Sequence, residues 1–392
     1  MNVLMISDVY FPRINGVSTS IQTFREGLRD EGVNVTLISP AYDGNHDKDD
    51  ADIVRLPART IPFDPEDRLM HGNALRDLAQ TLDGSNFDLI HIQTPFAAHY
   101  AALKLAKKWS KKRGIPCIAT YHTHFEEYFH HYLPILPRPL ARGLTRRIAR
   151  SQCNALDAVI VPSTAMHAAL RDYGVTKPLH ILPTGIPLEQ FDAPVNSTAR
   201  YGFRSKHGLP LDRPLALFVG RVAHEKNLRF LLEAMQHALT LNPGIALVIA
   251  GEGPALNSLK KAAAHLGIEQ DVFFLGYMDR KTELPACYAA ADLFAFPSVT
   301  ETQGLVLLEA MAAGLPVLGI PAMGAADILS PQRGAVCSPH DVNGFGGLMA
   351  ELLADTERLA ALSAAGRDFA RSWGAPERAR QLATLYRQLA AS

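Results

Sequence analysis

The chain of 392 residues lacks several features that mark specialised classes of protein. No apolar run approaches the roughly 18 residues needed to span a membrane. Lys plus Arg equals Asp plus Glu, with 39 of each, so the overall charge does not favour a nucleic-acid partner. The four cysteines, Cys117, Cys153, Cys287 and Cys337, are widely spaced, which fits a reducing compartment better than a disulfide framework or a metal site. These absences predict a cytoplasmic protein with no nucleic-acid partner.

Two further motifs are missing near the start of the chain. Residues 1–8 have neither the basic region nor the cleavage site of a signal peptide, and they predict a first strand instead. The loop that follows this strand has no G-x-G-x-x-G fingerprint. Its absence argues against an oxidoreductase that binds a nicotinamide dinucleotide.

What the chain does contain is a repeated alternation of short apolar runs and helical patterns. The runs are continuous rather than alternating, which favours parallel strands covered on both faces. Expected strands are 3–6, 33–38, 89–92, 117–121, 158–161, 215–219, 246–250, 272–275, 293–296 and 317–320. We therefore predict an α/β protein with two Rossmann-like, doubly wound parallel-sheet domains that face a cleft.

The expected domain boundaries follow from a break in this rhythm. Prolines and polar residues interrupt it near 183–197. We predict an N-terminal domain over 1–188, a linker over 189–200 and a C-terminal domain over 201–374. Residues 375–392 are expected to form a helix near or across the domain junction.

The most informative segment runs from Thr300 to Glu309, after the expected strand 293–296. Glu301 falls in a strand-to-helix turn, and Glu309 is expected about two turns into the helix. Amides at a helix N-terminus lack intrahelical partners and bind anions. Carboxylates that accept hydroxyl hydrogen bonds, next to such amides, indicate a site for a sugar joined to a phosphate.

A second loop with site chemistry follows the strand 215–219. Arg221 and Lys226 provide two cations suited to a diphosphate, although they would equally suit solvated loop charges paired with Glu225. Gly251, Glu252 and Gly253 follow the next strand and form either a simple turn or a point of close ligand approach.

The first domain offers Gly16 and His122. Gly16 opens a helix where a phosphate can approach the amides, and His122 follows the strand 117–121. Because His124, His130 and His131 lie nearby, a metal site is an alternative, but no H-x-x-x-H or H-E-x-x-H spacing occurs within the cluster. In another alternative, His122 is not catalytic and only forms hydrogen bonds with its protein neighbours.

Taken together, these segments resemble the retaining, nucleotide-sugar-dependent glycosyltransferases of the GT-B architecture, in their family four. The matching motifs cover nearly the whole chain, and the last of them is that family's E-x7-E motif. They are 11–17, His122-Thr123, 183–186, Gly220-Arg221 to Lys226-Asn227, and Glu301 to Glu309.

The resemblance implies an acceptor-binding domain over 1–188 and a nucleotide-sugar-binding domain over 201–374. It also implies a role for each expected site residue. Arg221 and Lys226 bind the donor diphosphate, Glu309 accepts hydrogen bonds from the ribose, and Glu301 holds the transferred sugar. Gly16 closes on the phosphates, and His122 lies against the sugar near the anomeric carbon. The sugar or phosphate also meets amides of Gln303, Gly304 and Leu305, and the base lies near Gly276 and Tyr277. The family route is front-face attack assisted by the leaving phosphate, with no metal or other cofactor required.

Details of the motifs resemble enzymes that glucosylate diacylglycerol and related sulfolipid synthases, with mannosyltransferases that use GDP-mannose close behind. We expect a hexosyltransferase that uses UDP-glucose or a similar UDP-sugar, or else GDP-mannose, and a lipid or lipid-linked acceptor. Alternatives are a glycan or small-molecule glycosyltransferase, a non-catalytic sugar-nucleotide sensor, and a related isomerase or phosphorylase, the last of which would need pyridoxal phosphate.

A basic segment bears on the acceptor. Residues 100–150 hold eleven Lys or Arg against two Glu. One expected helical face carries Lys104, Lys107, Lys108, Lys111 and Lys112. This face suggests peripheral attachment to anionic lipid at the inner face of the cytoplasmic membrane. The alternative is a solvated face of a helix packed on its own domain.

Overall fold

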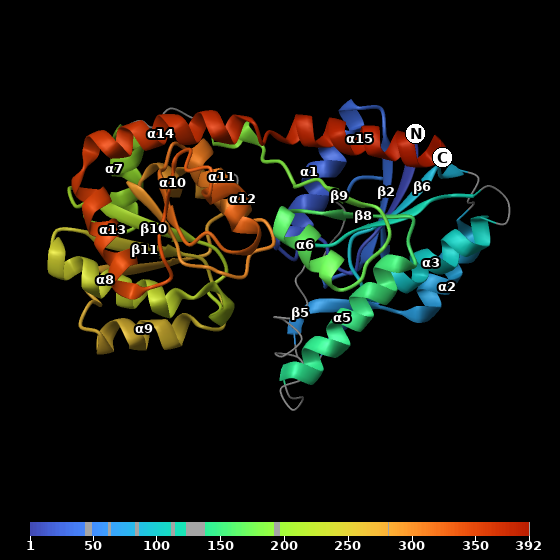
Figure 1. Cartoon of the computed structure of the whole chain (residues 1–392), viewed down its shortest axis with the longest axis horizontal. Coiled ribbons are helices and arrows are strands. Elements are labelled where there is room, and N and C mark those ends of the chain that lie inside the picture. Colours follow the sequence, from blue (N-terminus) through green and yellow to red (C-terminus); the bar gives the residue numbers. More distant parts are fainter. Residues whose placement is uncertain are drawn as a thin grey trace. The chain divides into compact units, whose positions relative to one another are not determined.

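The chain forms two compact units in the computed structural model, which describes residues 1–43, 49–61, 64–82, 86–110, 114–122, 138–191, 197–280 and 282–391. The first unit comprises Met1–Gly185 together with Ala375–Ser392, and the second comprises Ile186–Gly374. Each unit contains a parallel sheet with helices on both faces (Figure 1).

The sheet of the first unit has seven strands among the described residues, in the order β3-β2-β1-β6-β7-β8-β9. All neighbouring pairs are parallel, with Val3 opposite both Val35 and Leu89. The bounds are β1 (Asn2–Ile6), β2 (Asn34–Pro40), β3 (Ile53–Leu56), β6 (Leu89–Ile92), β7 (Cys117–Thr120), β8 (Ala158–Val161) and β9 (Leu179–Ile181). A separate antiparallel pair joins β4 (Ala58–Ile61) to β5 (Asp64–Met70).

Helices cover both faces of this sheet. They are α1 (Gly16–Asp30), α2 (Gly72–Thr81), α3 (Ala97–Ser110), α5 (Arg138–Asn154), α6 (Thr164–Asp172) and α15 (Ala375–Ala391). Asn15 caps α1 by accepting a hydrogen bond from the Ser18 amide at 2.9 Å. Ile21, Phe24 and Leu28 recur at helical spacing and are buried in the core of this unit.

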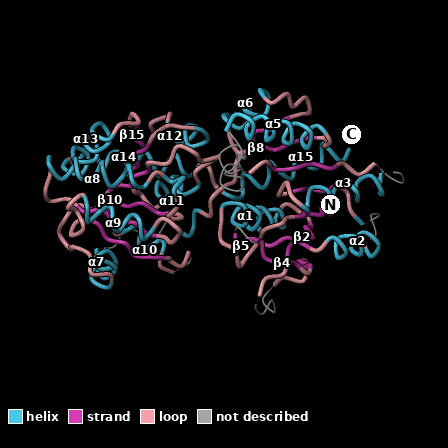
Figure 2. The backbone as a smooth tube through the Cα atoms, turned by 90° about the horizontal axis from the view of Figure 1, so that it is seen from below, coloured by secondary structure: helices cyan, strands magenta, loops and turns pink. Residues whose placement is uncertain are grey.

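The second unit repeats the design, with its sheet in the order β12-β11-β10-β13-β14-β15. Figure 2 shows its strands flanked by helices, as in the first unit. The strands are β10 (Leu215–Val219), β11 (Ala246–Ala250), β12 (Val272–Gly276), β13 (Leu293–Phe296), β14 (Val317–Gly319) and β15 (Ala335–Cys337). The helices are α7 (Ser197–Lys206), α8 (Leu228–Leu241), α9 (Leu256–His265), α10 (Leu284–Ala289), α11 (Leu305–Ala312), α12 (Ala326–Leu329), α13 (Val342–Ala354) and α14 (Thr356–Arg371), with short 3-10 turns η2 (Leu188–Gln190), η3 (His224–Lys226) and η4 (Met323–Ala325).

The described part of the expected linker over 189–200 belongs to the second unit. Phe191 is 2% exposed within that unit's core, and α7 begins at Ser197. The chain leaves the first unit after Gly185 and returns to it at Ala375. Around these crossings, the Ile186 amide donates to the Trp373 carbonyl at 3.0 Å. Pro183 and Pro187 therefore lie in folded chain rather than in a free linker.

The returning helix α15 completes the core of the first unit. It packs against α1 (Figure 1) and buries Leu382, Ala383, Leu385 and Tyr386 in the same cluster as Val3 and Ile21. The Tyr386 hydroxyl lies 2.6 Å from His91 Nδ1, and His91 Nε2 lies 2.7 Å from the Thr120 hydroxyl. Burial lowers the pKa of His91 to about 3, so the ring is neutral and both nitrogens are satisfied.

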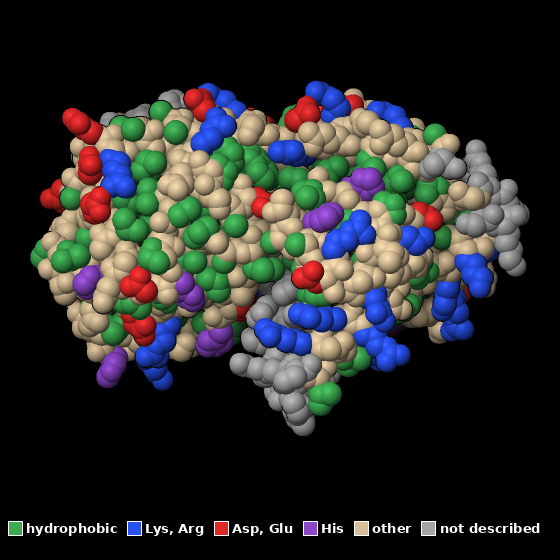
Figure 3. Space-filling view, in the orientation of Figure 1, with side chains coloured by type: hydrophobic (Ala, Val, Ile, Leu, Met, Phe, Trp, Pro, Cys, Tyr) green, Lys and Arg blue, Asp and Glu red, His purple; other side chains and the backbone are tan. Residues whose placement is uncertain are grey.

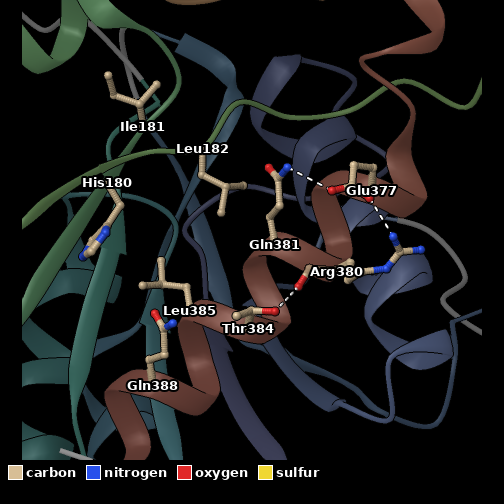
Figure 4. Close-up of a pocket in the computed structure, with 9 residues that line it drawn as sticks. All are labelled: His180, Ile181, Leu182, Glu377, Arg380, Gln381, Thr384, Leu385 and Gln388. Carbon is tan, nitrogen blue, oxygen red and sulfur yellow. Dashed lines mark hydrogen bonds and ion pairs between the residues drawn. The ribbon is translucent and has the colours of Figure 1, made fainter.

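A shallow hollow lies where the outer strand β9 meets α15. It is lined by His180, Ile181, Leu182, Glu377, Arg380, Gln381, Thr384, Leu385 and Gln388 (Figure 4). Its helix side chains pair along α15 itself: Arg380 and Gln381 donate to Glu377 at 2.7 and 3.1 Å. The hollow contains none of the residues expected at the site. No helix in the described part of the chain is both long and apolar enough to cross a bilayer.

Replacing Tyr386 with Phe is expected to destabilise the first unit. The change leaves buried His91 without its Nδ1 partner, at a cost of about 1–3 kcal/mol in the free energy of unfolding. Thermal and urea unfolding would measure the loss. Tyr201→Phe is the matched control, since Tyr201 is 53% exposed and should tolerate the change. Equal stability of the two variants would contradict the structural role of this hydrogen bond.

Candidate functional site

The site in the second unit forms where its strand order reverses. From β10 the chain continues to β11 on one side, whereas β13 lies on the other side of β10. Loop 220–227 follows β10 and loop 297–304 follows its neighbour β13, so both loops lie at the same edge of the sheet. Ligands of open parallel sheets bind at such a switch point.

Lys226 and Glu301 meet in this position. Lys226 Nζ lies 2.5 Å from Glu301 Oε1, and the Ser298 hydroxyl donates to the same oxygen at 3.1 Å. Both charged side chains are slightly under one-fifth exposed, so the pair is partly desolvated. Arg221 is 43% exposed and lies 3.8 Å from Glu225, beyond hydrogen-bond distance. The sequence alone left open whether these two cations pair with Glu225. Arg221 forms only a long contact with Glu225, and Lys226 pairs with Glu301 instead.

Backbone and side-chain contacts fix the two loops to each other. The Asn227 amide donates to the Pro297 carbonyl, and the Thr300 hydroxyl donates to the Glu225 carbonyl, both at 3.2 Å. The third loop, after β11, packs closely on the first. A Cβ at Gly251 would lie 1.9 Å from the Gly220 carbonyl oxygen, so only glycine fits. Gly251 is therefore explained by close packing of two loops.

The turn that carries Glu301 continues into α11 through Gln303, Gly304 and Leu305. Gly304 has φ +90°, which favours glycine, and precedes the first helical residue, Leu305. Gly324 of η4 donates its amide to the Glu301 carbonyl at 2.8 Å, and a Cβ there would lie 1.9 Å from the Thr302 carbonyl oxygen. Sequence patterns did not single out Gly324, because its role depends on a contact between distant loops.

Glu309 lies just over one turn into α11, not two turns as expected, because the helix begins only at Leu305. Glu309 as a whole residue is 1% exposed. Arg280 forms an ion pair with Glu309 Oε1, and the buried Tyr288 hydroxyl donates to Oε2 at 3.1 Å. Sequence reasoning missed both partners. Arg280 had an available signal, since it is a cation shortly after the end of a strand, as Arg221 is.

Gly276 and Tyr277 begin the loop that carries Arg280. Gly276 ends β12 with φ +76°, and its carbonyl accepts a hydrogen bond from the Gly251 amide at 2.7 Å. Tyr277 is 48% exposed. The structure thus brings the loops of Arg221, Lys226, Glu301, Gly276 and Glu309 to one edge of the second sheet.

Gly16 and His122 belong to the first unit. Gly16 starts α1, and a Cβ built on it would meet nothing within 4 Å, so protein packing does not demand glycine there. His122 follows β7, and its Nε2 lies 2.9 Å from Gln93 Oε1. Burial lowers the pKa of His122 to about 4, so the ring is neutral at physiological pH.

Asp8 has a buried carboxyl group at the edge of the first sheet where His122 also lies. Sequence patterns did not indicate this residue. It follows β1, accepts from the Thr94 hydroxyl at 2.8 Å and lies 3.1 Å from the Ala98 amide. Burial raises the pKa of Asp8 to about 6, against the opposing effect of these hydrogen bonds. Asp8, Thr94 and Gln93 thereby connect the ends of β1 and β6, next to His122.

The metal alternative falls mostly on residues outside the described part, namely His124, His130 and His131. Within the described ranges, no cluster of three His, Cys, Asp or Glu side chains could hold an ion. Burial raises the pKa of Cys117, Cys153 and Cys287 to about 12, which keeps these thiols protonated.

Comparison with known proteins agrees with this geometry. The family described as Glycosyltransferase Family 4 matches residues 14–190, and Glycosyl transferases group 1 matches residues 201–369. The alpha-monoglucosyldiacylglycerol synthase of Streptococcus pneumoniae is 33% identical over 321 residues, covering 81% of this chain and 70% of that protein. The chain belongs to glycosyltransferase family 4. The resemblance and the enzyme class predicted from its motifs are confirmed.

A relative and a solved structure extend the comparison for this glycosyltransferase. The GDP-mannose-dependent alpha-(1-6)-phosphatidylinositol monomannoside mannosyltransferase of Mycolicibacterium smegmatis is 28% identical, over 94% of this chain and 93% of that one. The crystal structure of Anabaena HepE in complex with UDP aligns with a TM-score of 0.78 at 18% identity, over 99% and 100% of the chains. This likeness confirms the expected fold class of two Rossmann-like parallel-sheet domains.

His122 is expected to stay neutral from pH 8 down to about pH 5. The reason is burial, which lowers its pKa to about 4, whereas an unfolded histidine titrates near 6.5. Because the unfolded chain binds the proton first, the stability that neutral His122 contributes is present above pH 6.5 and is lost as pH falls towards 4. Histidine ¹⁵N NMR over this range would report the ring state, with His122→Gln identifying the signal. A midpoint near 6.5 would show that the ring is solvated.

Proposed function

We propose that this glycosyltransferase moves a hexose from a nucleotide sugar to a lipid or lipid-linked acceptor, with retention of configuration at the anomeric carbon. UDP-glucose or a similar UDP-sugar is the first candidate donor, and GDP-mannose is the second. The observation that carries the proposal is the Lys226–Glu301 pair beside Arg221 at the switch point of the second sheet. It joins cations for a diphosphate to a carboxylate for sugar hydroxyls.

Each group has a proposed part in holding the donor. Lys226 and Arg221 bind the diphosphate, and Glu301 accepts hydrogen bonds from the sugar. Amides of Gln303, Gly304 and Leu305 at the start of α11 meet sugar or phosphate, since helix N-termini favour negative charge. Glu309 accepts from the ribose, and the base lies near Gly276 and Tyr277. In the first unit, Gly16 would approach the phosphates and His122 the sugar.

The reaction breaks the bond between the anomeric carbon and the phosphate oxygen and forms a bond from that carbon to the acceptor hydroxyl oxygen. The hydroxyl proton passes to the leaving phosphate, on the face of attack. Charge builds on the diphosphate as the bond breaks, and fixed cations stabilise that charge. One such group contributes about 3 kcal/mol to lowering the barrier. Neutral His122 would contact the sugar without adding positive charge next to the oxocarbenium-like carbon.

Arg221 and Lys226 provide the positive charge that a divalent ion supplies in other transferases. We therefore propose transfer without a metal or other cofactor, and activity should persist in excess EDTA. The lipid acceptor is supported by relatives whose names state lipid products, including the S. pneumoniae synthase and the M. smegmatis mannosyltransferase. We propose that the reaction takes place in the cytoplasm, at the inner face of the cytoplasmic membrane.

The donor site is tested by a mass-spectrometric transfer assay. Wild-type protein is mixed with UDP-glucose, UDP-galactose, UDP-N-acetylglucosamine or GDP-mannose, with and without vesicles that contain diacylglycerol and anionic lipid. One donor should give a hexosyl-lipid. Lys226→Ala and Glu309→Ala should each lower its rate by about a hundred-fold, because each removes a group that holds the donor.

Lys261→Ala is the matched control, since Lys261 is exposed on α9, and it should retain wild-type rates. Donor hydrolysis without a lipid product would redirect the search to soluble or polyprenyl-linked acceptors. Full activity in both site variants would overturn the donor assignment. Donor binding with no turnover of any kind would favour the non-catalytic sensor.

We further propose that the first unit docks on anionic lipid. On α3, Lys104, Lys107 and Lys108 are exposed, while Lys111 and Lys112 lie outside the described residues. The apolar stripe of this helix, Ala102, Leu105, Ala106 and Trp109, is buried. The expected alternative therefore holds for this stripe, which packs on its own domain and is not available to a membrane.

Helix α5 complements this charge with exposed apolar side chains. Leu140, Leu144 and Ile148 are 63%, 43% and 37% exposed, and their spacing of four places them along one ridge. The 17 residues of α5 include no Asp or Glu, and Arg147 and Arg150 are exposed beside the ridge. Figure 3 shows basic side chains gathered over α5. An apolar ridge on a helix with basic and no acidic side chains is complementary to an anionic bilayer surface.

Vesicle binding tests this docking. The protein should co-sediment with phosphatidylglycerol vesicles more than with phosphatidylcholine vesicles, and each lysine removed from α3 should weaken binding by about five-fold. Leu140→Gln with Leu144→Gln should weaken it several-fold further. Leu241→Gln is the matched control, because Leu241 is 59% exposed in the second unit. Equal binding to both vesicle types, or no effect of the α5 changes, would contradict the proposal.

A further inference from the structure

The carboxylate of Glu309 is buried in the second unit, where it contacts a cation and a phenol hydroxyl. Its side chain is 2% exposed, whereas that of its ion-pair partner Arg280 is 27% exposed. Arg280 reaches Oε1, and the Tyr288 hydroxyl donates to Oε2 at 3.1 Å. The carboxylate is thus oriented from both sides by groups of two other elements, the loop after β12 and helix α10.

Arg280 offsets the charge of the buried Glu309 carboxylate. Removing a carboxylate from water without a cation is unfavourable, because burial disfavours the charged form. The attraction is mutual: Glu309 raises the pKa of the Arg280 guanidinium. Among the described residues, Arg280 is the cation that forms an ion pair with Glu309.

The two contacts leave Glu309 with capacity for a ligand. An ionised carboxylate has about four acceptor positions, and Arg280 and Tyr288 occupy one on each oxygen. Two remain, which matches the two vicinal hydroxyls of a ribose.

We propose that Arg280 is a positioning residue that orients the Glu309 carboxylate to accept the ribose hydroxyls of the nucleotide. The inference rests on the proposed function, because it takes Glu309 as the ribose acceptor. Since Glu309 is nearly fully buried, ribose contact accompanies a local shift of its neighbours. Arg280, the more exposed partner, is the group that moves while its charge stays near the carboxylate.

The test is the affinity for ribonucleotides relative to 2′-deoxyribonucleotides. Calorimetry would compare UDP with 2′-deoxy-UDP and GDP with 2′-deoxy-GDP. The ratio of the two affinities cancels the contribution of the diphosphate, which both compounds share. Wild-type protein should prefer the ribonucleotide by roughly ten-fold, because a hydrogen bond to a charged group is lost in the deoxy compound.

Arg280→Gln should lose most of this preference, because no cation then orients the Glu309 carboxylate towards the ribose. Glu309→Gln should also lose the preference. Arg280→Lys keeps a cation and should keep most of the preference. Arg229→Gln is the matched control: it removes an exposed ion pair with Glu233 on α8 and should behave as wild type.

The outcomes distinguish a failure of the proposed function from a failure of the role of Arg280. If the wild type binds neither UDP nor GDP, the proposed function fails. If the wild type binds but Arg280→Gln keeps the wild-type ribose preference, the role of Arg280 is overturned. Tighter nucleotide binding by Arg280→Gln would also overturn it, since Arg280 would then compete with the ribose. Thermal unfolding of each variant would show that the second unit is folded in every comparison.

Discussion

Parallel strand order is the constraint on which the rest of this structure depends. In a parallel sheet every strand ends at the same edge, so loops that are far apart in sequence become neighbours there. In the second unit this edge joins loops that begin at Gly220, Gly251, Gly276 and Pro297. Glycine permits the close approach: the Gly251 position leaves no room for a Cβ against the Gly220 carbonyl. The proposed donor-binding groups of this family 4 glycosyltransferase come from loops at that edge.

Sequence patterns predicted the central strands well but missed three of the four outer strands of the two parallel sheets, for a physical reason. β10, β11 and β13 were predicted with their observed bounds, because strands buried on both faces are continuous apolar runs. β3, β9 and β15 were not predicted. They are short, lie at or next to a sheet edge and are partly exposed, so they carry a weak apolar signal. The linker was misassigned because prolines and polar residues also occur in folded turns, as Phe191 and α7 show.

At the site, too, some features could be predicted from local sequence and others could not. Arg221, Lys226 and Glu301 were found because each follows the end of a strand, which is a property of local sequence. The pairs they form were not predictable in this way, since Lys226 and Glu301 are 75 residues apart and Arg280 and Glu309 are 29 apart. Tyr288 gave no local signal at all, because an aromatic residue in an apolar helix is typical of a core. Partners depend on which loops become neighbours, and that follows only from the strand order.

The return of α15 to the first unit has a consequence for how the chain folds during synthesis. Residues 186–374 form the second unit without interruption, so this unit can complete its core once they have left the ribosome. The first unit begins earlier but lacks Leu382, Leu385 and Tyr386 until the last of its residues emerge. Until then, the face of α1 that α15 later covers stays open to water. Of the two units, the one whose translation starts first is thus the one that completes its core last.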